Sequence, residues 1–507
     1  MASNVTRRDF LKTAGVSAGV MMAAGYSPFS YAANDKIHVA KIGCGGQGLF
    51  RHMRDGLRLT EDIDVVTVCD VYEPNLRRGQ QTAEGMRNGE VPAYYDYREL
   101  LENENVDAFV ISTSQDAHYQ PTMDALDAGK YVFCEKTLTY DQDIAAGIQR
   151  SRDIVEKCHE TGLFCQVGHQ RRYNPQYLKA VWLARNERSL GRINYLRAQW
   201  HQNPRDAWRR PVDPGYEFNE QEAQFIDDLE RHMNWRHYPE RSGGLMTEFT
   251  AHQVDIWNWF LGTMPSRVWG SGGTDYWRDG REVVDNVALT YEYELRGTEL
   301  GFNDIPERTA ELEENFLELA RPYTVRGNYS CLLANAHGGI EEYIYGDLGT
   351  FELSERGDNL EGCYLLGEPD TQDIGEAQEA EQLDQEEGVD MEEVADAIAA
   401  GETLGLPPDA YRDPMPIRVV EERSPSHLQF EAFAKCIKEG GKPYNNEMVG
   451  HLTVVAVLKG LESVREETVV EIDPALYEFD FDTPDPYQYA YIADPEYADD
   501  NEEGLDI

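Results

Sequence analysis

The chain has 507 residues, a length that accommodates roughly two to four domains, and 41% of them are hydrophobic. Asp and Glu number 93 against 46 Lys and Arg, which gives a formal net charge of −47 at pH 7. A field of that sign repels nucleic acids and anionic membranes, so the composition excludes both as expected partners. The eight cysteines form no CxxC pair and are too scattered for a disulfide framework.

The basic residues are strongly biased toward arginine, with 35 Arg and only 11 Lys. A surface rich in carboxylates and poor in lysine stays hydrated where salt screens its self-repulsion. We interpret this composition as halophilic, that is, suited to high salt. The alternative is a generically acidic soluble protein.

Residues 1–32 are predicted to be a twin-arginine (Tat) signal peptide rather than part of the fold. Arg7 and Arg8 precede an apolar run over residues 14–24, and Ala32 ends a small-residue cleavage site. The alternative is a disordered terminus with a chance arginine pair. The Tat route carries folded proteins, so we expect the Tat export machinery as a partner and a periplasmic or extracellular location. No later segment is apolar enough to anchor the chain in a membrane after cleavage.

Residues 35–163 are predicted to form a Rossmann domain. Short apolar runs alternate there with helical stretches, a pattern that indicates a parallel sheet with right-handed crossovers. The predicted strands are Ile37–Ile42, Asp64–Cys69, Ala108–Ser112 and Tyr131–Cys134.

A glycine-rich pattern follows the first predicted strand. The pattern G-x-G-x-x-G is formed by Gly43, Cys44, Gly45, Gly46, Gln47 and Gly48. Between a strand and a helix it is typical of a dinucleotide site, where Gly43 allows the turn, Gly45 admits the pyrophosphate and Gly48 lets the helix pack. The helix N-terminus then faces the phosphates.

The second predicted strand ends at Asp70, where a carboxylate binds the ribose hydroxyls and repels a 2′-phosphate. This favours NAD over NADP. Arg77 and Arg78 follow closely, so NADP remains an open alternative.

Residues 164–472 are predicted to form a C-terminal α/β domain with a mostly antiparallel open sheet, because aromatic and alternating strands replace the buried apolar runs. The predicted strands are Tyr195–His201, Val283–Glu294, Tyr329–Asn335 and Glu341–Tyr345, and the predicted helices are His252–Leu261, His427–Gly440 and Met448–Val464. The fold class is therefore α/β, with two domains.

Three acidic segments are predicted to lie outside the packed core. Residues 303–321 and 368–413 are interpreted as insertions, the first of them helical. Residues 473–507 are predicted to be an extended tail lying on a surface of this chain or of a neighbouring subunit.

Four motifs in chain order give the sequence a specific resemblance. They are Thr113–His118, Glu135-Lys136-Thr137 after the fourth strand, Val167–Pro175, and the stretch from Gly243 to Asp255 that contains Glu248 and His252. Together they resemble the Gfo/Idh/MocA oxidoreductases, named for glucose–fructose oxidoreductase and inositol dehydrogenase. The family has Pro where this chain has Thr137, often with a cis peptide. It also has Asp where this chain has Glu248.

The resemblance implies roles for particular residues. It implies cofactor contacts from Thr113, His118, Glu135 and Lys136, and catalytic roles for Lys136, His252 and Glu248. Hydride transfer from an alcohol needs the hydroxyl proton to leave and the developing oxyanion to be stabilised, which suits a histidine base and a lysine cation. Glu248 lies four residues before His252, so its carboxylate is expected to orient the imidazole or the substrate. As isolated residues, the Lys and the His would instead be a surface side chain and a helix cap.

Substrate contacts are harder to assign from sequence. Arg171, Tyr173 and Asn174 are candidates for binding substrate hydroxyls, with packing at the domain junction as the alternative, and Asp255 is a candidate capping or orienting residue. Trp200, His201 and the segment 208–211 supply aromatic and guanidinium groups that suit sugar stacking or a buried cluster equally. No metal site is predicted, because no metal-ligand spacing is present.

The sequence therefore predicts an exported NAD-dependent oxidoreductase acting on a sugar, sugar acid or cyclitol, with the nucleotide held tightly and the chain assembled as a homodimer or homotetramer. Two alternatives stay open. One is a glycosidase that uses NAD for transient oxidation and elimination, and the other is a catalytically silent protein that binds sugar or nucleotide.

Overall fold

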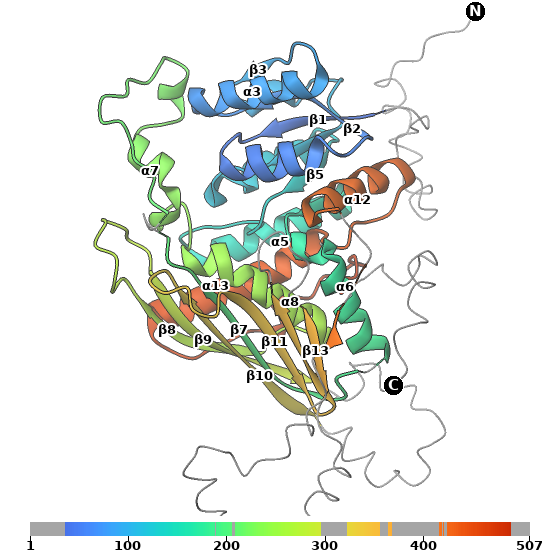
Figure 1. Ribbon diagram of the computed structural model, residues 1–507. Helices are drawn as coiled ribbons and strands as arrows, with labels where there is room; N and C mark the ends of the chain where they lie inside the picture. Colours follow the sequence, from blue (N-terminus) through green and yellow to red (C-terminus); the bar gives the residue numbers. More distant parts are fainter. Residues whose placement is uncertain are drawn as a thin grey trace, which may run out of the picture.

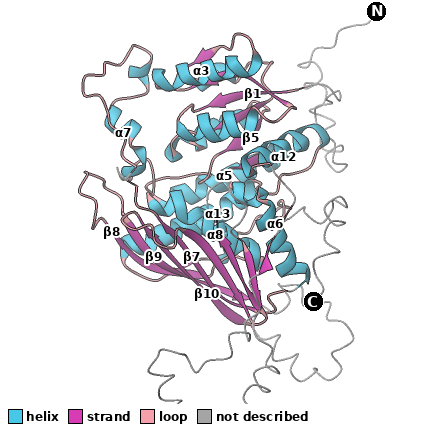
Figure 2. Cartoon of the chain, in the orientation of Figure 1, coloured by secondary structure: helices cyan, strands magenta, loops and turns pink. Residues whose placement is uncertain are grey.

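A computed structural model describes residues 36–187, 189–204, 208–295, 322–354, 363–367, 415–417, 419 and 423–487. Two β-sheets lie at opposite ends of the molecule, with helices between them (Figure 1). Figure 2 shows the larger sheet as one continuous curved layer below the helices. The predicted acidic insertions 303–321 and 368–413 lie outside the described residues, as do the signal peptide and the end of the tail.

The first sheet is the predicted Rossmann sheet, with strand order β3-β2-β1-β4-β5-β6 and parallel pairing throughout. Its strands are buried on both faces, which is why they read in the sequence as continuous apolar runs. The strands are β1 (Ile37–Ile42), β2 (Ile63–Cys69), β3 (Ala93–Tyr94), β4 (Ala108–Ile111), β5 (Tyr131–Cys134) and β6 (Cys165–Val167). The helices are η2 (Gln47–Leu57), α3 (Glu73–Arg87), η3 (Tyr97–Leu100), η4 (Gln115–Ala117), α4 (Tyr119–Asp127) and α5 (Ile144–Thr161).

The boundary between the two sheets lies later than residue 163. Strand β6, over Cys165–Val167, pairs with β5 and is the edge strand of the Rossmann sheet, not the start of the second domain. The sequence missed it because three residues are too few to show a strand pattern.

The second sheet has nine strands among the described residues, in the order β14-β13-β12-β11-β7-β10-β9-β8-β15. Its pairs are antiparallel except β7 with β10, which confirms the predicted mostly antiparallel sheet. The strands are β7 (Ile193–His201), β8 (Arg267–Gly273), β9 (Asn286–Leu295), β10 (Tyr323–Leu332), β11 (Ile340–Gly346), β12 (Gly349–Ser354), β13 (Tyr364–Gly367), β14 (Met415–Pro416) and β15 (Val470–Glu471).

Strand β10 lies earlier in the chain than the predicted strand 329–335. Its buried residues alternate from Val325 to Cys331, but Gly327 interrupts the apolar pattern. The structure gives a reason for that glycine, because a Cβ there would lie 2.7 Å from the Trp257 ring. Residues 333–339 turn instead, with Gly338 and Gly339 at positive φ.

Helices of the second half cover one face of this sheet (Figure 1). Helices α8 (Ala251–Leu261) and α13 (Glu447–Glu466) lie between the sheet and the Rossmann domain, and both are almost entirely buried. The others are η5 (Gln170–Tyr173), α6 (Pro175–Trp182), η6 (Leu183–Glu187), η7 (Glu222–Gln224), α7 (Leu229–Met233), η8 (Trp235–His237), η9 (Met246–Thr250), α12 (Pro425–Glu439) and η12 (Pro474–Leu476).

The last two long helices pack on the Rossmann domain. Helix α13 contacts α5, and α12 contacts η2, where Phe430 lies so close to Gly56 that a Cβ there would be 2.4 Å from its ring. The Phe430 ring also lies 4.6 Å from that of Phe133 in β5. The C-terminal part of the chain is therefore needed to cover the N-terminal domain.

The described part of the predicted tail lies on this chain. Phe481 stacks on His159 of α5 with ring centroids 3.9 Å apart, and the Arg152 guanidinium lies 4.2 Å from the Phe479 ring centroid. The side chain of Arg172 donates to the carbonyl of Pro486. Residues up to 487 thus extend over α5 and the second domain.

Candidate active site

A cavity of about 1260 Å³ opens at the carboxyl ends of the Rossmann strands and reaches into the second domain. This is where ligands bind in open parallel sheets. Residues from both domains line it, among them Gly43, Gly45, Gly46, Gln47, Asp70, Thr113, His118, Glu135, Lys136, Asn174, Trp200, Arg210, Arg236, Glu248, Phe249 and His252.

The glycine-rich loop forms one end of the cavity. Gly43 has φ 83°, and a Cβ there would lie 2.5 Å from the Ser112 carbonyl oxygen. At Gly48 a Cβ would lie 2.2 Å from the Gly43 oxygen. At Gly45, in contrast, it would meet only the Asn75 side chain, at 3.9 Å, so the backbone is open to the cavity. The first and last glycines are required by the fold, and the middle one leaves room for a phosphate group.

Asp70 lies at the end of β2 beside this loop. Its carboxylate accepts the backbone N–H of Cys44 at 2.7 Å and that of Tyr72 at 2.9 Å. Burial raises the pKa of Asp70, while the two backbone hydrogen bonds act in the opposite direction. The Asn75 side chain also hydrogen-bonds this carboxylate, which has about four lone-pair positions, so one remains for a ribose hydroxyl. Arg77 and Arg78 do not line the cavity; they bond to Glu73 and Asn75 on their own helix.

Thr113 follows β4, His118 caps the start of α4, and both line the cavity. The His118 Nδ1 is 2.9 Å from the carbonyl oxygen of Thr137, and its Nε2 is 3.3 Å from that of Thr113. Burial lowers the pKa of His118, so the ring is neutral and donates to one of these carbonyls. The Lys136–Thr137 peptide is cis.

Glu135 is buried beneath the cavity and holds several elements together. Its carboxylate bonds to His52 at 2.6 Å, to the Gln47 side chain at 2.9 Å and to the backbone N–H of Lys136 at 3.1 Å. Burial opposes ionisation, but the His52 hydrogen bond and the neighbouring cation of Lys136 lower the pKa of Glu135 to about 2. A Cβ at Gly168 would lie 2.7 Å from this carboxylate. Glu135 therefore fixes the backbone that carries Lys136.

Lys136 reaches across to the second domain. Its Nζ donates to the backbone carbonyl of Glu248 at 2.7 Å. The Glu248 carboxylate accepts the Gln115 side chain at 2.7 Å and the Arg236 Nε at 2.6 Å. The prediction that Glu248 orients the imidazole of His252 is thus not what the structure shows, because its carboxylate is held by Gln115 and Arg236 instead.

His252 begins helix α8 and faces the same part of the cavity. Burial lowers the pKa of His252 well below 6.5, and the cations of Lys136 and Arg171 lower it further. Its Nδ1 is buried without a hydrogen-bond partner among the described residues. The ring lies against that of Trp200, with centroids 5.3 Å apart and 20° between the planes. The imidazole is therefore neutral near pH 7 and can accept a proton.

Of the predicted substrate residues, only Asn174 lines the cavity. Arg171 forms a buried ion pair with Glu342, and Asp255 accepts the Arg172 guanidinium at 2.8 Å. Tyr173 is buried beside Tyr444. These three predicted side chains stabilise the junction behind the cavity wall, which is the packing alternative.

Comparisons with known proteins agree with this geometry. The Gfo/Idh/MocA oxidoreductase family, described as an NAD-binding Rossmann fold, matches residues 37–169, and the C-terminal domain of the same family matches residues 184–298. Two consecutive parts of the chain are therefore similar to the two domains of Gfo/Idh/MocA oxidoreductases. The resemblance carried by the Glu-Lys-Thr and Gly-Gly motifs is confirmed.

Several curated relatives in the family are inositol dehydrogenases. The inositol 2-dehydrogenase/D-chiro-inositol 3-dehydrogenase of Lactiplantibacillus plantarum is 32% identical over 145 residues, 28% of this chain and 39% of that protein. The scyllo-inositol 2-dehydrogenase (NAD(+)) of Bacillus subtilis is 27% identical over 237 residues, 47% of this chain and 57% of that protein. The chain therefore matches about two fifths of the length of the Lactiplantibacillus plantarum enzyme.

Solved structures share the fold. An oxidoreductase domain protein from Kribbella flavida superposes with a TM-score of 0.58 at 17% identity, over 87% of this chain and 100% of that one. Apo scyllo-inositol dehydrogenase from Lactobacillus casei superposes with a TM-score of 0.54 at 16% identity, over 87% of this chain and 99% of that one. These solved structures therefore share the fold of this chain, a Rossmann domain followed by a mixed, mostly antiparallel sheet.

Against this family background, several residues of the site were not predicted. His52 bonds to Glu135, and Gln115 and Arg236 bond to Glu248. Gln115 lies within the Thr113–His118 motif but had no predicted role, and nothing in the local sequence marks His52 or Arg236. Trp200 and Phe249 form an aromatic wall, with ring centroids 4.7 Å apart and 27° between the planes. The alternating pattern of β7 predicted Trp200 as part of a strand but not which way it faces.

The described part of the chain lacks two further features. It contains no group of three or more His, Cys, Asp or Glu side chains placed to hold a metal ion. None of its helices is both long enough and apolar enough to cross a membrane.

Proposed function

We propose that the protein is an NAD-dependent oxidoreductase that transfers hydride between the nicotinamide and a hydroxyl-bearing carbon of a sugar, sugar acid or cyclitol. One observation supports this most directly. A single cavity is lined both by the open glycine loop with Asp70 and by Lys136 and His252. A dinucleotide in that cavity has its adenosine end at Asp70 and its other end at the Lys–His pair.

The chain's own groups divide the work of the reaction. Bound NAD accepts or supplies the hydride. The Lys136 ammonium hydrogen-bonds the reacting oxygen and stabilises its developing negative charge. His252, neutral because of burial and nearby cations, takes the hydroxyl proton during oxidation. Glu248 keeps its place through Gln115 and Arg236, and its carbonyl holds Lys136 against the cavity.

The lining of the second domain supports a polyhydroxylated ring as substrate. The wall made by Trp200 and Phe249 offers a flat apolar face, and Gln170, Asn174 and Gln176 are also among the residues that line the cavity. Such a mixture of aromatic faces and amides suits a molecule with apolar C–H faces and hydroxyl edges. Relatives named as inositol dehydrogenases have substrates of this kind.

The decisive test is an assay of reduced-nucleotide formation with NAD⁺ and a panel of inositols, aldoses and sugar acids. We expect turnover with at least one substrate and a loss of about a hundredfold or more in kcat for Lys136→Ala and for His252→Asn. Lys157→Ala, on α5 away from the cavity, is the matched control. Cleavage of aryl glycosides without net reduction of NAD⁺ would instead identify the glycosidase.

We further propose that the cofactor is NAD rather than NADP and that it stays bound during use. The carboxylate of Asp70 disfavours a 2′-phosphate, and neither Arg77 nor Arg78 is among the residues that line the cavity. Free nucleotide is scarce outside the cytoplasm, so an exported enzyme needs to retain its own. Native mass spectrometry of purified protein should show one NAD per chain.

Export and assembly complete the proposal. The twin arginines at positions 7 and 8 are proposed to direct the folded protein through the Tat route. The open face of the second sheet, which carries Tyr195, Arg197 and Trp269, is proposed to form the homo-oligomer contact. Arg7→Lys with Arg8→Lys should leave the protein in the cytoplasm, and size-exclusion chromatography with light scattering should give a dimer or tetramer.

A further inference from the structure

A short segment of the second domain lies against the glycine-rich loop. It contains Trp208, Arg209 and Arg210, and Arg210 lines the cavity opposite the loop. A Cβ built on Gly46 would lie 3.1 Å from the Arg210 Nη2. Gly46 is the residue from which helix η2 starts, so a cation from one domain touches the phosphate-binding motif of the other.

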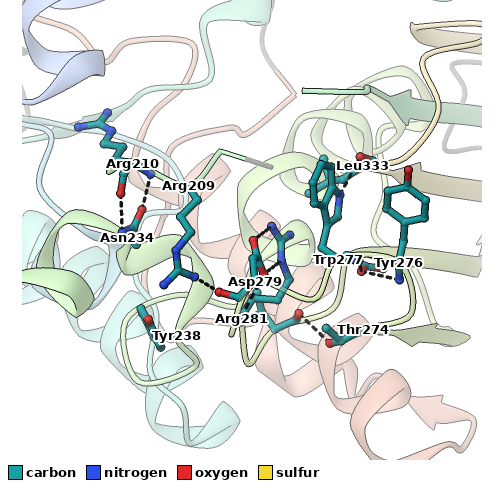
Figure 3. Close-up of polar contacts among 12 residues, drawn as sticks. Arg209, Arg210, Asn234, Tyr238, Thr274, Tyr276, Trp277, Asp279, Arg281 and Leu333 are labelled. Atoms are coloured by element: carbon teal, nitrogen blue, oxygen red, sulfur yellow. Dashed lines mark hydrogen bonds and ion pairs between the residues drawn. The ribbon is translucent and has the colours of Figure 1, made fainter. Parts of the chain in front are cut away.

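The backbone of Arg210 is fixed by a buried asparagine. The N–H of Arg210 donates to the Asn234 side-chain oxygen at 2.6 Å, and the Asn234 amide donates back to the Arg210 carbonyl at 3.1 Å. Figure 3 shows both bonds, with the Arg210 side chain pointing away from them. Asn234 also donates to Glu230 at 3.0 Å, which anchors it. The position of Arg210 is therefore set by backbone contacts that leave its guanidinium available.

The neighbouring arginine has a different role. The Arg209 guanidinium donates to Glu230 at 2.6 Å. It also donates to the carbonyl of Asp279 (Figure 3). Arg209 thus ties the segment to the second domain. Arg210 has no ion pair or side-chain hydrogen bond among the described residues.

The electrostatic surroundings of Arg210 call for an anion. Its pKa is lowered, first because protein displaces water around the guanidinium and then because Arg236 and Arg78 repel it. No carboxylate contributes in the opposite direction. The N-terminal amides of η2 add positive potential at the same place. This concentration of positive charge becomes favourable when a phosphate group lies between Arg210 and the loop.

We propose that Arg210 binds the dinucleotide pyrophosphate from the side of the second domain and so clamps the cofactor between the two domains. This inference rests on the proposed function, because it takes the ligand of the glycine loop to be a dinucleotide. Arginine suits the task, since its planar fork matches two phosphate oxygens. A cofactor held from both sides dissociates only when the segment 208–211 moves or when the Arg210 guanidinium loses its contacts with the pyrophosphate.

The test compares ligands that differ in the pyrophosphate. Dissociation constants for NAD⁺, ADP-ribose and adenosine are measured by competition with fluorescent etheno-NAD⁺. The proteins are wild type, Arg210→Gln, Arg210→Lys and the matched control Arg278→Gln, an exposed arginine of the same domain that does not line the cavity. Thermal unfolding of each protein checks the fold.

Arg210→Gln should weaken NAD⁺ and ADP-ribose by about tenfold each and leave adenosine unchanged, because only the first two have the pyrophosphate. Arg210→Lys should fall between Arg210→Gln and wild type, and Arg278→Gln should match wild type. Unchanged NAD⁺ binding in Arg210→Gln, or equal weakening of adenosine, overturns the clamp while the proposed function stands. A wild-type protein that binds neither NAD⁺ nor ADP-ribose overturns both.

Discussion

Two alanine substitutions in the same glycine motif should have opposite consequences. A Cβ at Gly48 would lie 2.2 Å from the Gly43 carbonyl oxygen, whereas ordinary contact begins at 3.4 Å. The two backbones would have to separate by about 1.2 Å, the difference between those distances, although Gly43 lies in the buried turn after β1 and Gly48 in the buried first turn of η2. Overpacking of this kind costs up to about 3 kcal/mol. Gly48→Ala should therefore lower the midpoint of thermal unfolding by about 5–10 °C.

Gly45→Ala should leave the fold intact and weaken the binding of NAD⁺. Its Cβ would meet only Asn75, at 3.9 Å, and the backbone φ is not in the left-handed region. The free energy of unfolding should change by less than about 0.5 kcal/mol. The methyl group would point into the space where a phosphate approaches, so the affinity for NAD⁺ should fall by at least about tenfold.

Both variants are measured by thermal unfolding without added nucleotide and by titration with NAD⁺. The assignment of Gly45 to the pyrophosphate fails if Gly45→Ala binds NAD⁺ as wild type does. The packing argument fails if Gly45→Ala and Gly48→Ala lose stability equally.

Three further outcomes are expected. The imidazole of His252 must be neutral to accept a proton, and because its pKa lies well below 6.5, kcat/KM should stay flat from about pH 8 down to 6 and fall only at lower pH. A fall in kcat/KM centred near pH 6.5 would contradict this. Phe430→Ala should destabilise the Rossmann domain by about 3–5 kcal/mol and speed hydrogen exchange in η2, because the ring is fully buried between η2 and β5. Unchanged exchange in η2 would show that α12 does not stabilise that helix. The net charge of −47 should make the unfolding midpoint rise between roughly 0.1 and 1 M NaCl, as the Debye length falls from about 10 to 3 Å; a midpoint independent of salt would argue against a halophilic protein.

The local features of the Rossmann half were predictable because each carries its own signal. Strands buried on both faces are continuous apolar runs, and the glycines at 43 and 48 are required by contacts within a few residues or with the adjacent strand. Lys136 and His252 were predicted from motifs, and the structure brings both to one cavity. Periodicity and short motifs are enough wherever the determining contacts are local.

Contacts between distant residues were beyond the sequence. Glu248 was expected to orient His252 because the two are one helical turn apart, yet Gln115 and Arg236 approach from other elements and take its carboxylate. Arg171 and Asp255 looked like polar site residues, but partners far away in the chain neutralise them. The sequence around a charged side chain does not show whether that side chain forms a buried ion pair with a residue distant in the chain.

The packing of α12 on η2 also sets the order in which the protein can be completed. Helix η2, which carries the phosphate-binding loop, is synthesised long before Phe430, and until α12 arrives its inner face remains uncovered. Domains usually fold as they emerge from the ribosome, N-terminal part first. Here the packing of the Rossmann domain is completed only after α12, near the end of the chain, has been synthesised. Under the proposed export with bound nucleotide, the nucleotide would have to bind between release of the chain from the ribosome and export.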